Sequence, residues 1–159
     1  MVEVIVSIAL SLVVIVAITE LNLQTIKISQ QSMIELRASM YLTEGIEVGK
    51  DLELSDAGWD KIINTTCISS SLVCHPSIAS GVWTLVPAPI PDTVKVDGSI
   101  FTQSVWVESV NRTNLCAFPN EIASSGCLDP KTKKFVSRVT WTDNQGLHSM
   151  QLETYLYHF

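Results

Sequence analysis

The chain has 159 residues, a length that suits one domain with an appended segment. Apolar residues make up 47% and charged residues 16%, so a packed core is expected and a wholly disordered chain is excluded. The net charge of −6 and the lack of a basic cluster argue against nucleic acid as a partner, because a duplex-binding surface needs grouped Lys and Arg side chains to displace counterions.

The first element in chain order is a strongly apolar run. Residues 4–18 are apolar except for Ser7 and Ser11. With Leu21 and Leu23 the run reaches about 20 residues, or roughly 30 Å of helix, which is enough to span a bilayer. We therefore predict a transmembrane helix at the start of the chain.

The placement of charge distinguishes this run from an ordinary signal anchor. The first positive side chain is Lys27, whereas a signal peptide carries positive charge before its apolar run. Glu3 lies at the head of the run, where a carboxylate without a partner is costly. Two interpretations of Glu3 stay open: a specific partner, or a frayed helix end near the lipid headgroups, where the helix dipole also favours an acidic residue.

The apolar run continues into a longer helical pattern. No glycine precedes Gly45 and no proline precedes Pro76, so we predict one helix from about Val2 to Glu53, roughly 75 Å long. A single domain rarely needs a helix of this length, so its first half is expected to be buried in something else. The face expected to pack on the rest of the chain repeats in alternating steps of four and three residues: Ile34, Ala38, Tyr41, Gly45, Val48 and Leu52.

Four cysteines follow the helix: Cys67, Cys74, Cys116 and Cys127. No CxxC motif is present, and the spacings do not fit common zinc sites. Each close pair lies among Ser, Thr, Asn and Pro residues, which predicts two disulfides in exposed loops and an oxidising compartment. Of the three connectivities, we predict the nearest-neighbour one, Cys67–Cys74 with Cys116–Cys127.

The rest of the chain carries β-strand signals separated by turns. β-branched and aromatic residues mark four segments, and a four-residue connection ending in Gly146 joins the last two as a hairpin. We predict an α+β fold in which the C-terminal half of the long helix packs on an antiparallel sheet of about four strands. The strands are expected at residues 82–86, 100–110, 135–142 and 147–157, with loops over residues 54–80 and 111–134.

The sequence contains no motif for catalysis, for phosphate binding or for a metal site. The histidines His75, His148 and His158 have no metal-ligand partner at helical spacing, so we predict no enzyme, no cofactor and no metal. Asn64 and Asn111 begin N-glycosylation sequons in predicted exposed loops, which makes them candidate glycosylation sites.

The chain resembles the type IV pilins and the pseudopilins of type II secretion. The shared features are an apolar start with one early glutamate, a long helix and a β-rich module with disulfides. The start MVEVIVSIALSLVVIVAI resembles a mature pilin after leader removal. The segment YLTEGIEVGKDL followed by Trp59, and the ending VTWTDNQGLHSMQLETYLYHF, resemble the minor-pilin branch. Two departures are clear: the family glutamate normally lies two residues later than Glu3, and Glu20 stands where many members carry a proline.

The resemblance implies the pilin fold and a structural subunit of a type IV pilus that supports adhesion or motility. Residues 1–24 would lie in the inner membrane before assembly and in the filament core afterwards, while residues 25–159 would form the globular head. The implied partners are copies of the chain, other pilins and the pilus assembly machinery, with the finished filament on the bacterial surface. Glu3 would pair with the amine of Met1 in a neighbouring subunit. The predicted packing residues are Leu10, Leu12, Val13, Ile15, Val16 and Ile18.

Two other functions compete with a major pilin. The chain would equally suit a minor pilin or pseudopilin that caps a filament or drives secretion or DNA uptake. A single-pass membrane-anchored enzyme or receptor domain is the third hypothesis. The lack of N-terminal positive charge and of catalytic motifs argues against the third.

Overall fold

The chain divides by its internal contacts into two units, Met1–Arg37 and Ala38–Phe159, named here the helical unit and the head unit. This boundary follows contacts, whereas the predicted division after residue 24 follows hydropathy, so the two mark different properties of the chain. The computed structural model describes residues 2–54, 56–79, 81–87, 92–96, 99–113, 121–123, 125–143 and 146–158.

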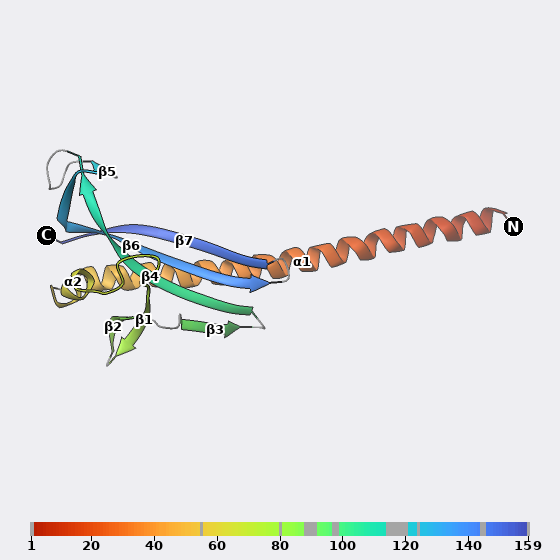
Figure 1. The fold of residues 1–159 in the computed structure, drawn as a ribbon. Helices are drawn as coiled ribbons and strands as arrows, with labels where there is room; N and C mark the ends of the chain where they lie inside the picture. Colours follow the sequence, from red (N-terminus) through yellow and green to blue (C-terminus); the bar gives the residue numbers. More distant parts are fainter. Residues whose placement is uncertain are drawn as a thin grey trace. The chain divides into compact units, whose positions relative to one another are not determined.

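Helix α1 covers Val2–Glu53 without a break, which confirms the helix predicted from the lack of early Gly and Pro residues (Figure 1). The predicted packing face is right at four of its six positions, because Ile34 and Tyr41 are only half-buried. The buried face is also wider than one stripe, and its members are Ala38, Leu42, Gly45, Ile46, Val48, Gly49 and Leu52.

Two glycines allow α1 to approach the sheet closely within the head unit. A Cβ atom at Gly45 would lie 2.3 Å from the hydroxyl oxygen of Ser137. A Cβ atom at Gly49 would lie 2.9 Å from the ring of Phe135. Contacts this short require a neighbour to move, so these two positions carry no side chain because of the sheet behind them.

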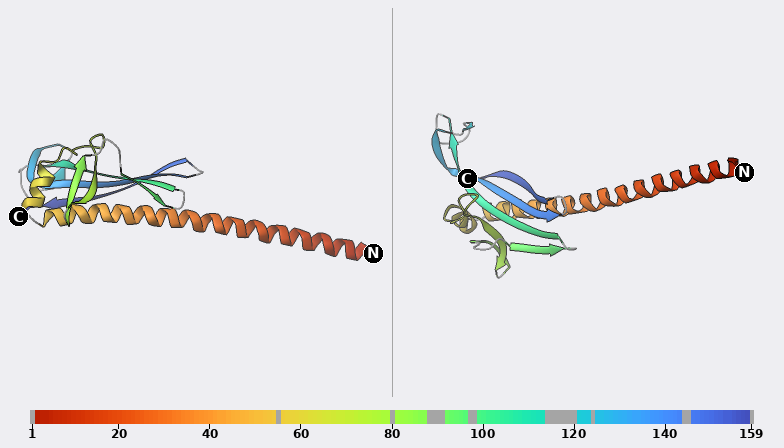
Figure 2. Two further views of the ribbon diagram at one scale, coloured as in Figure 1. Left: turned by 90° about the horizontal axis from the view of Figure 1, so that it is seen from below. Right: turned by 45° about the vertical axis from the view of Figure 1, so that its right-hand side comes forward.

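The head unit contains a seven-stranded sheet among the described residues, with strand order β2-β1-β4-β6-β7 and with β3 and β5 also paired to β4. Each pairing is antiparallel. Residues 38–53 of α1 run along one face of this sheet, which gives the predicted α+β arrangement of a pilin-like fold (Figure 2). The strands are β1 (Cys74–Ala79), β2 (Val82–Pro87), β3 (Asp92–Val96), β4 (Ser99–Arg112), β5 (Ile122–Ala123), β6 (Cys127–Asp143) and β7 (Gly146–Tyr157).

The predicted loop over residues 54–80 is wrong, because it contains the helix α2 (Asp56–Ile63) and the strand β1. In α2, Trp59 and Ile62 lie three residues apart and are both buried, so core packing stabilises a short helix despite Gly58. In β1, Pro76 is tolerated because this strand pairs with β4 only at Cys74, which leaves the proline's missing N–H without a required partner on that side.

The predicted loop over residues 111–134 is also wrong in part. Strand β4 ends at Arg112, and β6 begins at Cys127, eight residues before the predicted strand at Phe135. The two strands stay paired from Ile100 with Thr142 to Arg112 with Cys127, with an irregularity between Ser109 and Val110. The predicted hairpin of the last two strands is confirmed as β6 and β7.

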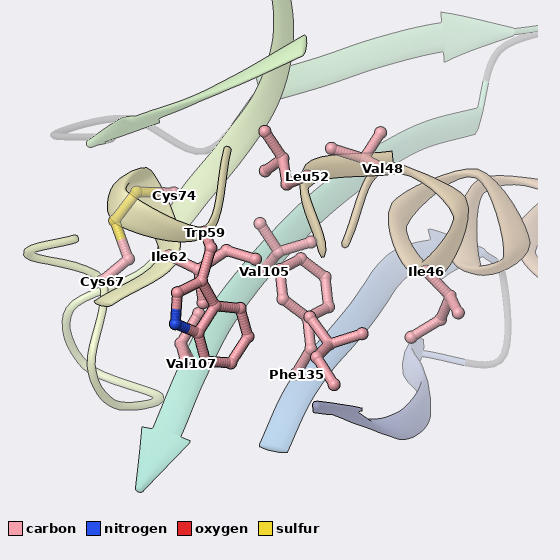
Figure 3. Packing of buried hydrophobic residues seen from close by; sticks show 11 residues of the cluster. Ile46, Val48, Leu52, Trp59, Ile62, Cys67, Cys74, Val105, Val107 and Phe135 are labelled. Carbon is pink, nitrogen blue, oxygen red and sulfur yellow. A yellow bond between two sulfur atoms is a disulfide. The ribbon is translucent and has the colours of Figure 1, made fainter. Parts of the chain in front are cut away.

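The core of the head unit lies between α1, α2 and the sheet (Figure 3). Its aromatic members are Trp59 from α2 and Phe135 from β6, and Trp83 and Leu85 of β2 pack against its edge. Helix, sheet and the first cysteine pair therefore share one hydrophobic cluster: Ile46, Val48, Leu52, Trp59, Ile62, Cys67, Cys74, Val105, Val107, Phe135 and Leu156.

The Cys67–Cys74 disulfide is confirmed, with a Cα–Cα distance of 5.5 Å. Its expected place in an exposed loop is wrong, because both cysteines are buried in the core, and the carbonyl of Cys67 accepts a hydrogen bond from the Val107 amide at 2.8 Å. Cys127 is also disulfide-bonded, but Cys116 lies outside the described residues, so the pairing of these two stays a prediction.

Replacing Cys67 and Cys74 with serine is expected to lower the free energy of unfolding by at least about 2.5 kcal/mol, from the loop-closure entropy regained by the unfolded chain. Two buried serine hydroxyls add to this loss. Urea unfolding of the full chain in detergent measures the difference. The double alanine variant removes the disulfide without burying hydroxyl groups, so it separates the loop-closure contribution from the cost of the buried serines. A loss below about 1 kcal/mol in both variants would contradict the expectation.

Candidate assembly surface

The helical unit exposes the six side chains predicted to pack between subunits. Their exposed fractions run from 52% to 67%, so none is covered by its own chain: Leu10, Leu12, Val13, Ile15, Val16 and Ile18. Apolar side chains also lie on all sides of this part of α1, which is typical of a helix surrounded by lipid or by other helices.

Length and hydropathy make α1 able to cross a membrane. Its most apolar 18-residue window has a mean hydropathy of 2.7 and no part of that window is buried within the chain. A helix of this kind near the start of a chain is compatible with a membrane anchor and with a signal sequence.

The hydroxyl groups along the apolar run are satisfied within the helix. Ser7 donates to the carbonyl of Glu3 and Ser11 donates to the carbonyl of Ser7, each at 2.8 Å. Thr19 donates to the carbonyl of Val16 at 2.8 Å. Because these hydroxyls bond to backbone carbonyls, they add no unsatisfied donor to a surface that meets lipid or apolar side chains.

Glu3 lies in the first turn of α1, with Ser7 and Ser11 on the same side of the helix. The three residues share a shallow groove with the apolar side chains of Val4, Ile8 and Leu12. In the described part of the chain no side chain forms an ion pair with the Glu3 carboxylate. Met1 lies outside the described residues, so the pairing of Glu3 with its amine in a neighbour stays a prediction.

After residue 24, four further large apolar side chains of the helical unit are more than half exposed, and they are not among the residues predicted to pack between subunits. They lie off the buried stripe that begins at Ile34. The sequence could have revealed them, because they are apolar residues in an otherwise polar stretch of helix. These residues are Ile26, Ile28, Met33 and Leu36.

Two of the three histidines of the head unit stack on tryptophan rings. His148 bonds to Asp143 through its Nε2 atom at 2.9 Å and stacks on Trp141, while His158 stacks on Trp59. His75 lies in β1. Among the described residues, no group of three or more His, Cys, Asp or Glu side chains is placed to bind a metal ion.

A buried ion pair joins β4 to β6. The Arg112 guanidinium and Thr132 hydroxyl both donate to the Asp129 carboxylate, and the Lys131 amide donates to its other oxygen. Burial raises the pKa of Asp129, but the hydrogen bonds from Thr132, Arg112 and Lys131 outweigh it, so the pKa lies below its ordinary value of 3.8. The network therefore ties the start of β6 to the end of β4.

A second charge cluster lies on the solvent side of the sheet. Lys134 bonds to Glu153 at 2.9 Å and to Glu108 at 3.3 Å. The hydrogen bond to Glu153 raises the pKa of Lys134, and the same bond lowers the pKa of Glu153. Because both glutamates are about 40% exposed, solvent screens these pairs and their contribution to stability is small.

The two sequons differ in accessibility. Asn64 is exposed in the turn after α2, as predicted. Asn111 is half-buried within β4, where it pairs with Leu128 of β6 and Ala123 of β5, so the predicted exposed loop is wrong at this residue.

Comparisons with models of known protein families, with curated proteins and with solved structures find no match for this chain.

Proposed function

We propose that this chain is a structural subunit of a pilus-like filament. Residues 1–24 anchor it in a membrane before assembly and pack between other copies of the chain afterwards. The observation that carries the proposal is the wholly exposed apolar surface of the helical unit, joined by one continuous helix to a folded α+β head.

The size of the exposed apolar surface explains why lipid or other helices must shield it from water. Burying one Val, Leu or Ile side chain contributes about 1.5–3 kcal/mol, so the six packing residues together represent roughly 9–18 kcal/mol. That is comparable with the whole stability of a typical domain, about 5–15 kcal/mol. Lipid supplies the cover for a single subunit, and the helices of other copies supply it in a filament.

Glu3 favours a filament over a simple anchor. A carboxylate at the head of an apolar run adds nothing to anchoring and is costly in lipid. Between packed helices it supplies a polar contact in a surface that otherwise lets neighbours slide past each other. The proposed partners are therefore copies of this chain and related subunits, with the head displayed at a cell surface for adhesion or motility.

The proposal is tested by expressing the full chain with a pilus assembly system and measuring its amount in sheared surface filaments. We expect the unchanged chain in that fraction, and we expect Ile15→Lys to be depleted from filaments, since a cation in the middle of the run costs about 2.5–3.5 kcal/mol in apolar surroundings.

The matched control is Ile78→Lys, which places the same charge on an exposed apolar residue of β1 in the head. It should leave the amount in the filament fraction unchanged. A wild-type chain that stays in the membrane as a monomer, or an Ile15→Lys chain found in filaments, would contradict the proposed function.

A further inference from the structure

The helical unit carries two isolated opposite charges. Glu20 and Lys27 are the only charged residues between Glu3 and Glu35, and both are exposed on α1. Seven residues separate them, which is close to two helical turns, so they lie on nearly the same side of the helix about 10.5 Å apart along its axis. In the described part of the chain, no ion pair joins them.

Glu20 lies inside the proposed packing segment and Lys27 lies three residues beyond it, so both charges would need a partner where the helices of other copies replace lipid and water. Removing an ionised side chain from water is costly unless it is paired. Pairs within one helix form at spacings of three or four residues, and neither charge has an opposite charge at that spacing. The partner must therefore come from another chain.

We propose that Lys27 of one copy pairs with Glu20 of a neighbouring parallel copy that is displaced along the helix axis by seven residues, about 10.5 Å. The inference rests on the proposed filament function and specifies its register. Seven residues are close to two full helical turns, so residues that lie seven positions apart share nearly the same side of the helix. A displacement of seven residues therefore lets the apolar side chains of the two copies meet in the same way at every heptad.

The ion pair supplies the register that an apolar surface lacks. Apolar contacts alone allow several displacements of similar stability, whereas opposite charges at one level favour a single displacement and like charges oppose it. A contact of Glu3 with a neighbour's amine needs a displacement of only about two residues, so the two contacts involve different neighbours of the same subunit.

Charge reversal tests the pairing in the full chain. Glu20→Lys and Lys27→Glu should each lower the amount of sheared filament by on the order of tenfold, because each places like charges at the contact. The double variant should return to within about twofold of the unchanged chain, because it restores opposite charges. The matched controls are Glu121→Lys and Lys61→Glu, which make the same charge changes at exposed positions of the head and should have no effect.

Cross-linking measures the displacement directly. A Glu20→Cys/Lys27→Cys chain, oxidised in membranes or filaments, should give a ladder of multimers, since the introduced thiol at position 20 of one copy would meet the introduced thiol at position 27 of the next. Either single cysteine variant should give none, because like positions lie at different levels. Efficient cross-linking of a single variant would show unstaggered helices and overturn the pairing.

The two proposals fail in different ways. If the unchanged chain assembles but the double charge reversal stays as poor as the single variants, the pairing of Glu20 with Lys27 is overturned and the filament function stands. If the unchanged chain forms neither multimers nor filaments, both proposals are overturned. An intact Cys67–Cys74 disulfide in every variant shows that the head has folded.

Discussion

Replacing Glu3 with alanine or glutamine should leave the subunit folded and inserted in the membrane but reduce its assembly into filaments by at least about tenfold. Both substitutions remove a carboxylate whose cost in lipid is about 2.5–3.5 kcal/mol near the bilayer centre and less near the interface, so insertion should be unchanged or improved. Loss of the proposed contact between subunits is what should lower assembly, because residues 4–18 around it carry no other charged side chain that could replace it.

The measurement compares the amount of subunit in the membrane fraction with the amount in sheared filaments. Glu47→Gln is the matched control, because Glu47 is an exposed acidic residue of the same helix within the head unit. A lower amount in filaments together with an unchanged or higher amount in the membrane would show that Glu3 acts in assembly and not in anchoring. A Glu3→Ala chain with normal filament yield would show that Glu3 is only a frayed helix end near the headgroups.

Replacing Asp129 with asparagine should lower the free energy of unfolding of the head by about 3–5 kcal/mol. The change removes the negative charge that contacts the buried Arg112 guanidinium, of whose side chain 5% is exposed. Asparagine keeps only one acceptor oxygen, so either Thr132 or the Lys131 amide also loses its acceptor. Urea unfolding of the full chain in detergent, followed by tryptophan fluorescence, measures this loss.

The control for Asp129 is Glu153→Gln, which removes the partner of Lys134 on the solvent side of the sheet and should cost less than about 1 kcal/mol. A double variant, Arg112→Met with Asp129→Leu, removes both buried charges and should recover most of the stability. Equal small losses in Asp129→Asn and Glu153→Gln would show that the buried pair contributes no more than the exposed one.

The effect of Asp129 should also depend on pH. Because its pKa is lower in the folded head than its ordinary value of 3.8, its contribution is complete above that value and is lost as the pH falls through the folded pKa. The difference in stability between the wild-type chain and Asp129→Asn should therefore be constant near neutral pH and shrink below about pH 3.8. A difference that grows on acidification would contradict the assigned ion pair.

The sequence alone predicted the elements that depend on residues close together in the chain. The continuous helix from Val2 to Glu53 follows from the absence of early Gly and Pro residues, and the final hairpin follows from alternating side chains around Gly146. The exposed apolar surface was likewise predictable from the sequence, because the hydropathy of residues 4–18 marks a run of side chains that the chain itself does not cover. The nearest-neighbour pairing of Cys67 with Cys74 needed only loop length and composition.

Only the tertiary structure revealed the features that depend on residues far apart in the chain. Helix α2 is stabilised by burying Trp59 and Ile62 in the core, and the early start of β6 is stabilised by Asp129 contacting Arg112, seventeen residues before it. The sequence around each site suggested a loop, because glycine, proline and charged residues are loop formers wherever no partner is known. The close approach of α1 to the sheet at Gly45 and Gly49 also depends on distant residues. The need for glycine is visible only once Ser137 and Phe135 are known to lie against these two positions.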